Sequence, residues 1–232
     1  MNEVLFSTTW GPFHEQFFNT SPIDVMNQRF SRGCDIFSLN GHLHMNWAHL
    51  IAQNIDRLHP RAGSRPEEMI ELHGHLEGMR CLEGCSGVWS IPAEFDGWVT
   101  DDAIDDNDLK LLTCPLCGSP ARPHVLWFDE FYDEENYGFA SAQRAVANAS
   151  LCITAGTSGG IPVAERLAGI AARAGATLID INTRDNPLRR LAARQGGFIE
   201  GSATSALQAV AEVVREETAG AAGDPPAAGW SG

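Results

Sequence analysis

The most informative stretch of the chain contains two polar blocks, Gln53-Asn54-Ile55-Asp56-Arg57-Leu58-His59 and Glu71-Leu72-His73-Gly74. The four residues ahead of them, His49-Leu50-Ile51-Ala52, are mostly apolar and predict a short buried strand. Amide and carboxylate groups that follow such a strand would destabilise the fold if they were buried without partners. We therefore expect them to line a pocket at the end of the strand. The plainer alternative is a polar loop in which His59 and His73 cap backbone groups.

The size and charge of the chain exclude several classes of protein. Its 232 residues suffice for one domain with a substantial core and a small insert. The formal net charge of -14 argues against a nucleic-acid-binding surface, which requires clustered Lys and Arg. No apolar run reaches the length of a membrane span, and the start shows no basic export signal. We therefore expect a cytoplasmic protein without nucleic-acid or membrane partners. The acidic segments favour basic peptides, or are simply solvated loops.

Four of the six cysteines form two short pairs, Cys81 with Cys85 and Cys114 with Cys117. Without an export signal, cysteines indicate reduced thiols or metal ligands rather than disulfides. Four thiolates close a tetrahedral structural zinc site and leave no open coordination position. A redox motif at Cys114 and Cys117 is the competing interpretation, but it leaves the first pair unexplained.

The second half of the chain alternates between strand and helix patterns. We predict a helix over 141–149, a strand over 151–155, a helix over about 163–174, a strand over 176–182, a short strand near 198–203 and a helix over 205–217. A glycine-rich turn, Gly156–Gly160, follows the first of these strands, a layout typical of mononucleotide binding. This alternation predicts an α/β protein with a parallel, doubly wound sheet.

Five motifs over roughly residues 49–216 resemble the sirtuin family. They are the signature formed by the two blocks quoted above, the cysteine pairs, Arg122-Pro123-His124-Val125-Leu126-Trp127-Phe128-Asp129-Glu130, Gly156-Thr157-Ser158, and Ile179-Asp180-Ile181-Asn182. The resemblance implies a Rossmann-like fold with a small inserted zinc module. It also implies an NAD-dependent protein-lysine deacylase, which acts on an acyl-lysine protein or peptide and releases nicotinamide and O-acyl-ADP-ribose. The cofactors implied are NAD and one structural zinc ion.

The resemblance also assigns roles to single residues. His73 corresponds to the catalytic base, a role that suits a group with a pKa near neutral pH. Val125 and Phe128 correspond to residues of the acyl-lysine channel. Arg57 stands where the family often has glycine. The residues implied to bind NAD are Gln53, Asn54, Asp56, Gly156, Thr157, Ser158, Asn182, Ser202 and Ala203.

The resemblance divides the chain into an atypical segment 1–48, an NAD-binding domain over 49–78 and 121–218, a zinc module over 79–120 and a disordered tail over 219–232. In 1–48 we find neither the usual first strand nor the glycine-rich loop that would hold a pyrophosphate. Either an N-terminal segment is missing or the protein is a natural variant, and we expect weak NAD binding. The alternative function is a non-catalytic sirtuin-like module that binds basic or acylated peptides.

Overall fold

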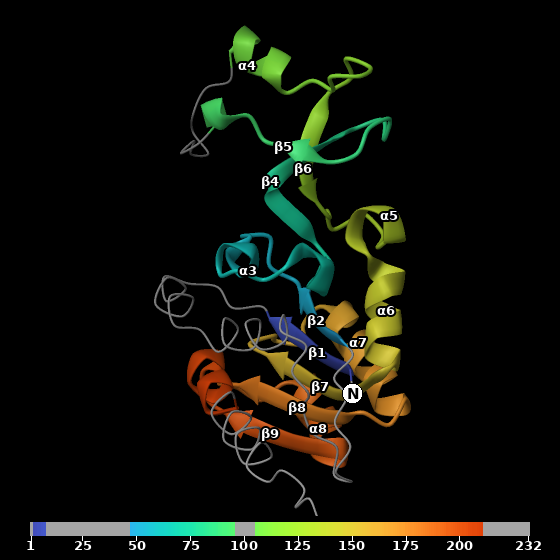
Figure 1. Cartoon of the computed structure of the whole chain (residues 1–232), viewed down its shortest axis with the longest axis vertical. Helices are drawn as coiled ribbons and strands as arrows, with labels where there is room; N and C mark the ends of the chain where they lie inside the picture. Colours follow the sequence, from blue (N-terminus) through green and yellow to red (C-terminus); the bar gives the residue numbers. More distant parts are fainter. Residues whose placement is uncertain (1, 8–46, 96–104, 211–232) are drawn as a thin grey trace, which may run out of the picture.

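The computed structural model describes residues 2–7, 47–95 and 105–210, and for residues 2–7, 47 and 48 only the backbone (Figure 1). The predictions about the glycine-rich loop, the end of the last helix and the C-terminal tail concern residues outside these ranges. None of the helices in 47–95 and 105–210 has the length and apolar content that a membrane span requires.

A large parallel sheet forms the base of the molecule (Figure 1). Its strands are β1 (Asn2–Ser7), β2 (Trp47–Ala52), β3 (Met69–Glu71), β7 (Ala149–Ala155), β8 (Thr177–Asn182) and β9 (Gly196–Glu200). They lie in the order β3-β2-β1-β7-β8-β9, and every neighbouring pair is parallel. Counted along the chain, this is the 3-2-1-4-5-6 order of dinucleotide-binding sheets. The predicted fold class is therefore confirmed.

The prediction that residues 1–48 lack a first strand is wrong for β1. This strand lies at the centre of the sheet and pairs with β2 on one side and β7 on the other. The only sequence signal is a run of three apolar residues, Val4-Leu5-Phe6. Such a short run has no period of its own, because central parallel strands do not alternate apolar with polar residues. Pairing with two neighbouring strands, rather than local pattern, defines β1.

Helices cover both faces of the large sheet. On one face, α6 (Phe139–Ala147), α7 (Pro162–Arg173) and α8 (Pro187–Gln195) enclose a core with Ile51, Leu72 and Cys152. On the other face, the helix that starts at residue 203 packs Leu207 against Ile181. Helix α8 was not predicted, although its start has a recognisable signal. The side chain of the N-cap residue, Asn186, accepts hydrogen bonds from two backbone N–H groups, and proline occupies the first turn.

A small antiparallel sheet, in the order β5-β4-β6, projects from the large one (Figure 1). Its strands are β4 (Gly74–Cys81), β5 (Trp89–Ser90) and β6 (Ala121–Val125). The predicted zinc module, 79–120, is therefore drawn too narrowly, because β6 pairs with β4 and not with the large sheet. Short helices complete this part of the chain: α3 (Leu58–Arg61), η1 (Pro66–Glu68), η2 (Ala93–Phe95), α4 (Asp106–Leu111) and α5 (Glu134–Tyr137).

Candidate functional site

Polar residues gather at the carboxyl edge of the large sheet. Gln53 follows β2, Gly156 follows β7, and Asn182 ends β8. In a parallel sheet these ends share one edge, and the order reverses between β1 and β7, where such folds bind their ligands. The side chain of Asn182 donates a hydrogen bond of 2.7 Å to the backbone oxygen of Thr157, so β8 and the glycine-rich turn are joined directly.

His73 lies between β3 and β4, and both of its ring nitrogens have partners. Nδ1 is 2.6 Å from the backbone oxygen of Gln53, and Nε2 is 3.0 Å from the hydroxyl of Tyr132. A carbonyl oxygen only accepts, so Nδ1 carries the proton and Nε2 has the lone pair. Burial lowers the pKa of His73, and the contact with the Gln53 carbonyl opposes this shift in part. The ring is therefore a neutral base whose basic nitrogen is defined.

Gly74 explains why a glycine follows this histidine. Its φ of +70° is a conformation that residues with a side chain rarely adopt. A Cβ atom at this position would also overlap the backbone oxygen of His124, on the neighbouring strand β6. The close approach of β6 fixes the start of β4 and, with it, the backbone that carries His73.

The first polar block contacts His73 through the backbone oxygen of Gln53, and its first two side chains are buried. Gln53 is 5% exposed and Asn54 is 6% exposed. Neither the oxygen nor the nitrogen of the Gln53 amide has a hydrogen-bond partner among the described residues. Asp56 accepts a hydrogen bond of 3.1 Å from the backbone N–H of Leu58, at the start of α3. An unpaired buried amide is costly in a folded protein, so Gln53 is the residue here that most needs a ligand.

Arg57 has a backbone conformation that favours glycine. Its φ of +60° is the only positive φ of a non-glycine residue in the described part of the chain. The guanidinium compensates by pairing with Glu71 at 2.9 Å. Burial nevertheless raises the pKa of Glu71, and Arg57 opposes that rise. Arginine at this position thus combines backbone strain with an ion pair that glycine could not form.

The glycine-rich turn rests on a buried polar network that sequence analysis missed. Asp180, in the middle of β8, is fully buried. It accepts hydrogen bonds from the hydroxyl of Thr154 on β7 and, at 2.8 Å, from the side-chain amide of Asn186. Because Asn186 also caps α8, the network ties the ends of β7 and β8 to that helix. The only sign of this network in the sequence is the carboxylate of Asp180 inside an apolar strand, because a buried carboxylate requires hydrogen-bond partners.

Ser202 and Ala203 lie close to this edge, since the backbone N–H of Gly201 donates to the oxygen of Asn182 at 3.0 Å. The hydroxyl of Ser202 accepts a hydrogen bond of 3.2 Å from the backbone N–H of Ser205. It therefore caps the helix that follows. Ala203 packs against the core on that face of the sheet.

The two predicted acyl-channel residues occupy different environments. Val125 ends β6 opposite Gly74, one residue from His73, whereas the side chain of Phe128 is fully exposed. The loop between them is held by Arg122, which forms an ion pair with Glu130 and lies over the ring of Trp127 at 3.5 Å. The loop lies beside His73, because the backbone N–H of Leu126 donates a hydrogen bond of 3.0 Å to the backbone oxygen of His73.

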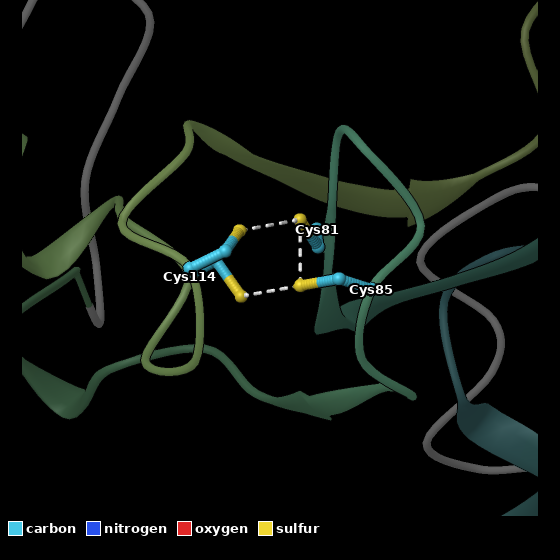
Figure 2. A group of neighbouring side chains, drawn as sticks. Cys81, Cys85 and Cys114 are labelled. Carbon is cyan, nitrogen blue, oxygen red and sulfur yellow. Dashed lines mark hydrogen bonds between the residues drawn. The ribbon is translucent and has the colours of Figure 1, made fainter.

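The four cysteines of the two predicted pairs come together at the end of the small sheet, where Cys81 is the last residue of β4. Figure 2 shows Cys81, Cys85 and Cys114 directed toward a common centre, and the four sulfur atoms lie within 4.8 Å of one another. Adjacent sulfurs are 3.4 to 3.6 Å apart. A zinc ion with Zn–S bonds of about 2.3 Å would need edges of roughly 3.8 Å, so a small outward relaxation accommodates it. This donor set fits a closed structural zinc site.

The sheet order, the polar carboxyl edge and the four-cysteine module define a Rossmann-type α/β protein with an inserted metal-binding module. The model of the Sir2 family matches residues 16–162, and the chain belongs to this family.

Individual relatives agree with this assignment. An NAD-dependent protein deacylase from Thermus thermophilus is 36% identical over 156 residues, 66% of this chain and 54% of that protein. NAD-dependent protein deacylase 2 from Corynebacterium efficiens is 37% identical over 144 residues, 62% and 52% of the two chains. The solved complex of a Sir2 homologue with NAD has a TM-score of 0.62 at 28% identity, over 88% of this chain and 69% of that one. The chain thus spans about half the length of the curated relatives it matches.

Proposed function

We propose that the protein is an NAD-dependent protein-lysine deacylase that releases nicotinamide and O-acyl-ADP-ribose. The observation that carries this proposal is the pairing of His73 with the carboxyl end of β2. A neutral imidazole is held there by Gln53, whose buried amide has no hydrogen-bond partner among the described residues. The names of the relatives support the reaction type. Membership in the Sir2 family supports the cofactor.

The residues at the carboxyl edge fit a dinucleotide. The amide of Gln53 offers a donor and an acceptor that no described residue uses. Asn54 and Asp56 would form the nicotinamide pocket, and Gly156, Thr157, Ser158 and Asn182 would hold the remainder of the cofactor, with Ser202 and Ala203 near its adenine end. When bound, NAD supplies the electrophilic ribose carbon. Weak NAD binding remains our expectation, because we can identify no glycine-rich loop in residues 1–48.

His73 would act as the general base at Nε2. Its other nitrogen is engaged by Gln53, so a proton can be accepted only at Nε2. Because burial lowers the pKa of His73, the ring remains neutral at the start of the reaction over a wider pH range. Val125 and Phe128 would border the acyl-lysine on the side of β6.

The zinc ion would stabilise the small sheet and take no part in the chemistry. Cys81, Cys85, Cys114 and Cys117 supply four thiolates, which fill a tetrahedral coordination sphere. A cytoplasmic location is part of the proposal, because these ligands must remain reduced.

The test measures nicotinamide release from NAD in the presence of an acetyl-lysine peptide. We expect release that depends on the peptide and is abolished by His73→Asn, with zinc content unchanged. The matched control is His75→Asn, because the ring of His75 packs against His124, at 5.3 Å between ring centroids, instead of contacting Gln53. Peptide binding without nicotinamide release by the wild-type chain would support the non-catalytic module. Full turnover by His73→Asn would exclude this histidine as the base.

A further inference from the structure

We propose that Tyr132 is a positioning residue for His73: in the ligand-free protein its hydroxyl donates a hydrogen bond to Nε2 and holds the imidazole in the tautomer and orientation required of the base, until a substrate hydroxyl takes its place at Nε2. This inference rests on the role proposed above for His73. It assigns a function to a residue that lies 59 positions away in the sequence and outside the motifs that identify the family.

The direction of this hydrogen bond follows from its neighbours. The backbone oxygen of Gln53 cannot donate, so the proton of the neutral ring is at Nδ1. Nε2 can therefore only accept, and the Tyr132 hydroxyl, 3.0 Å away, is the donor. The imidazole is thus held at both nitrogens, by a carbonyl from the β2 side and a phenol from the β6 side.

Tyr132 is itself firmly positioned. Its ring stacks on that of Phe139 at the start of α6, with centroids 5.0 Å apart. Two residues before Tyr132 in the sequence, Glu130 forms an ion pair with Arg122. On the other side, the backbone oxygen of Asp133 accepts a hydrogen bond of 3.1 Å from the N–H of Phe139. A hydroxyl on a ring with these restraints can orient its partner without losing much side-chain entropy.

This contact has a consequence for the acid–base behaviour of His73. A hydrogen bond donated to Nε2 stabilises the neutral imidazole, since the imidazolium has no lone pair there, and it therefore lowers the pKa. The acidic side chains of the neighbouring segments are engaged elsewhere. Glu71 pairs with Arg57, Asp56 accepts from the N–H of Leu58, Glu130 pairs with Arg122, and Asp133 accepts from the N–H of Asn136. Removing the hydroxyl should raise the pKa of His73.

The two tyrosines of the chain provide a matched pair of variants. Tyr132→Phe removes the hydroxyl and keeps the stacked ring. Tyr137→Phe removes a hydroxyl that has no partner among the described residues, from a ring that stacks on His124 instead. The pKa of His73 is measured by NMR from the ring Cε1–H signal, which is assigned by its loss in His73→Asn. We expect Tyr132→Phe to raise this pKa by about 0.5–1 unit and Tyr137→Phe to leave it unchanged.

The rate of nicotinamide release by the same variants is measured as a function of pH. We expect the acid limb of kcat/KM to move to higher pH in Tyr132→Phe, in step with the NMR value, while activity at high pH is retained. The NMR titration does not require turnover, so it decides the role of Tyr132 even if the chain proves to be no deacylase. An unchanged His73 pKa in folded Tyr132→Phe would overturn the inference.

A second measurement guards against a Tyr132→Phe variant that fails to fold. Incorporation of 3-fluorotyrosine into Tyr137→Phe labels Tyr132 alone, preserves its shape and makes its hydroxyl a stronger donor. We expect the pKa of His73 to fall, in the direction opposite to that of Tyr132→Phe. A pKa equal to that of unlabelled Tyr137→Phe would contradict a hydrogen bond from Tyr132.

Discussion

The backbone oxygen of Gln53 lies 2.6 Å from Nδ1 of His73, and this contact joins the two polar blocks of the sequence into one site. It leaves Nε2 as the basic nitrogen. The same residue that orients the histidine also presents a buried amide without a partner in the described residues. One residue therefore serves two purposes: its main chain prepares the base, and its side chain offers hydrogen bonds to a ligand.

The activity should extend to lower pH than an ordinary histidine allows. Burial lowers the pKa of His73 from its usual value of 6.5. A base with a lowered pKa stays neutral as the pH falls, so the acid limb of kcat/KM should lie below pH 6.5. Nicotinamide release measured across the acidic range checks this. A limb above that value would show that His73 is not the group that titrates.

Replacing Gln53 should separate stability from ligand binding. Gln53→Met keeps the length of the side chain and removes a buried amide that has no hydrogen-bond partner within the described ranges. We expect the ligand-free protein to gain about 1 kcal/mol in free energy of unfolding, because the desolvation penalty of the amide disappears. The rise in melting temperature caused by NAD should shrink at the same time. A variant destabilised by the change would contradict an unpaired amide.

Two substitutions of Arg57 should isolate the backbone strain at this position. Both Arg57→Gly and Arg57→Ala remove the ion pair with Glu71, but only glycine relieves a φ of +60°. We expect the glycine variant to be more stable than the alanine variant by about 1 kcal/mol. At most other positions this order is reversed, because glycine loses more backbone entropy on folding. Denaturant unfolding of the two variants gives the comparison, and greater stability of Arg57→Ala would refute the strain.

Zinc content should depend on the clustered thiols and not on the remaining described cysteine. Cys114→Ser removes a buried member of the cluster, whereas Cys152→Ala removes a thiol in the core of the large sheet. We expect one zinc per chain in the wild type and in Cys152→Ala, and much less in Cys114→Ser. Metal analysis after exhaustive dialysis provides the measurement. Full zinc occupancy in Cys114→Ser would exclude the four-thiolate site.

A common site for His73 and Gln53 was expected because both belong to the sirtuin signature, and because a buried strand followed by polar groups calls for a pocket. The large sheet was equally accessible, since alternating strands and helices leave few topologies. Local sequence patterns did not predict strand β1 or the pairing of β4 with β6. Strand pairing depends on partners that are distant in the chain. The buried group formed by Asp180, Thr154 and Asn186 escaped prediction for the same reason.

The sequence by itself determined the fold class, the family and the residue types available at the site, because hydrophobic period and motif spacing are local properties of the chain. Only the tertiary structure decided which atoms meet. Tyr132 shows the difference: nothing in its sequence context distinguishes it from Tyr137, five residues later. The fold turns one hydroxyl toward His73 and stacks the other ring on His124, since the direction of a side chain depends on packing against elements far away in the sequence.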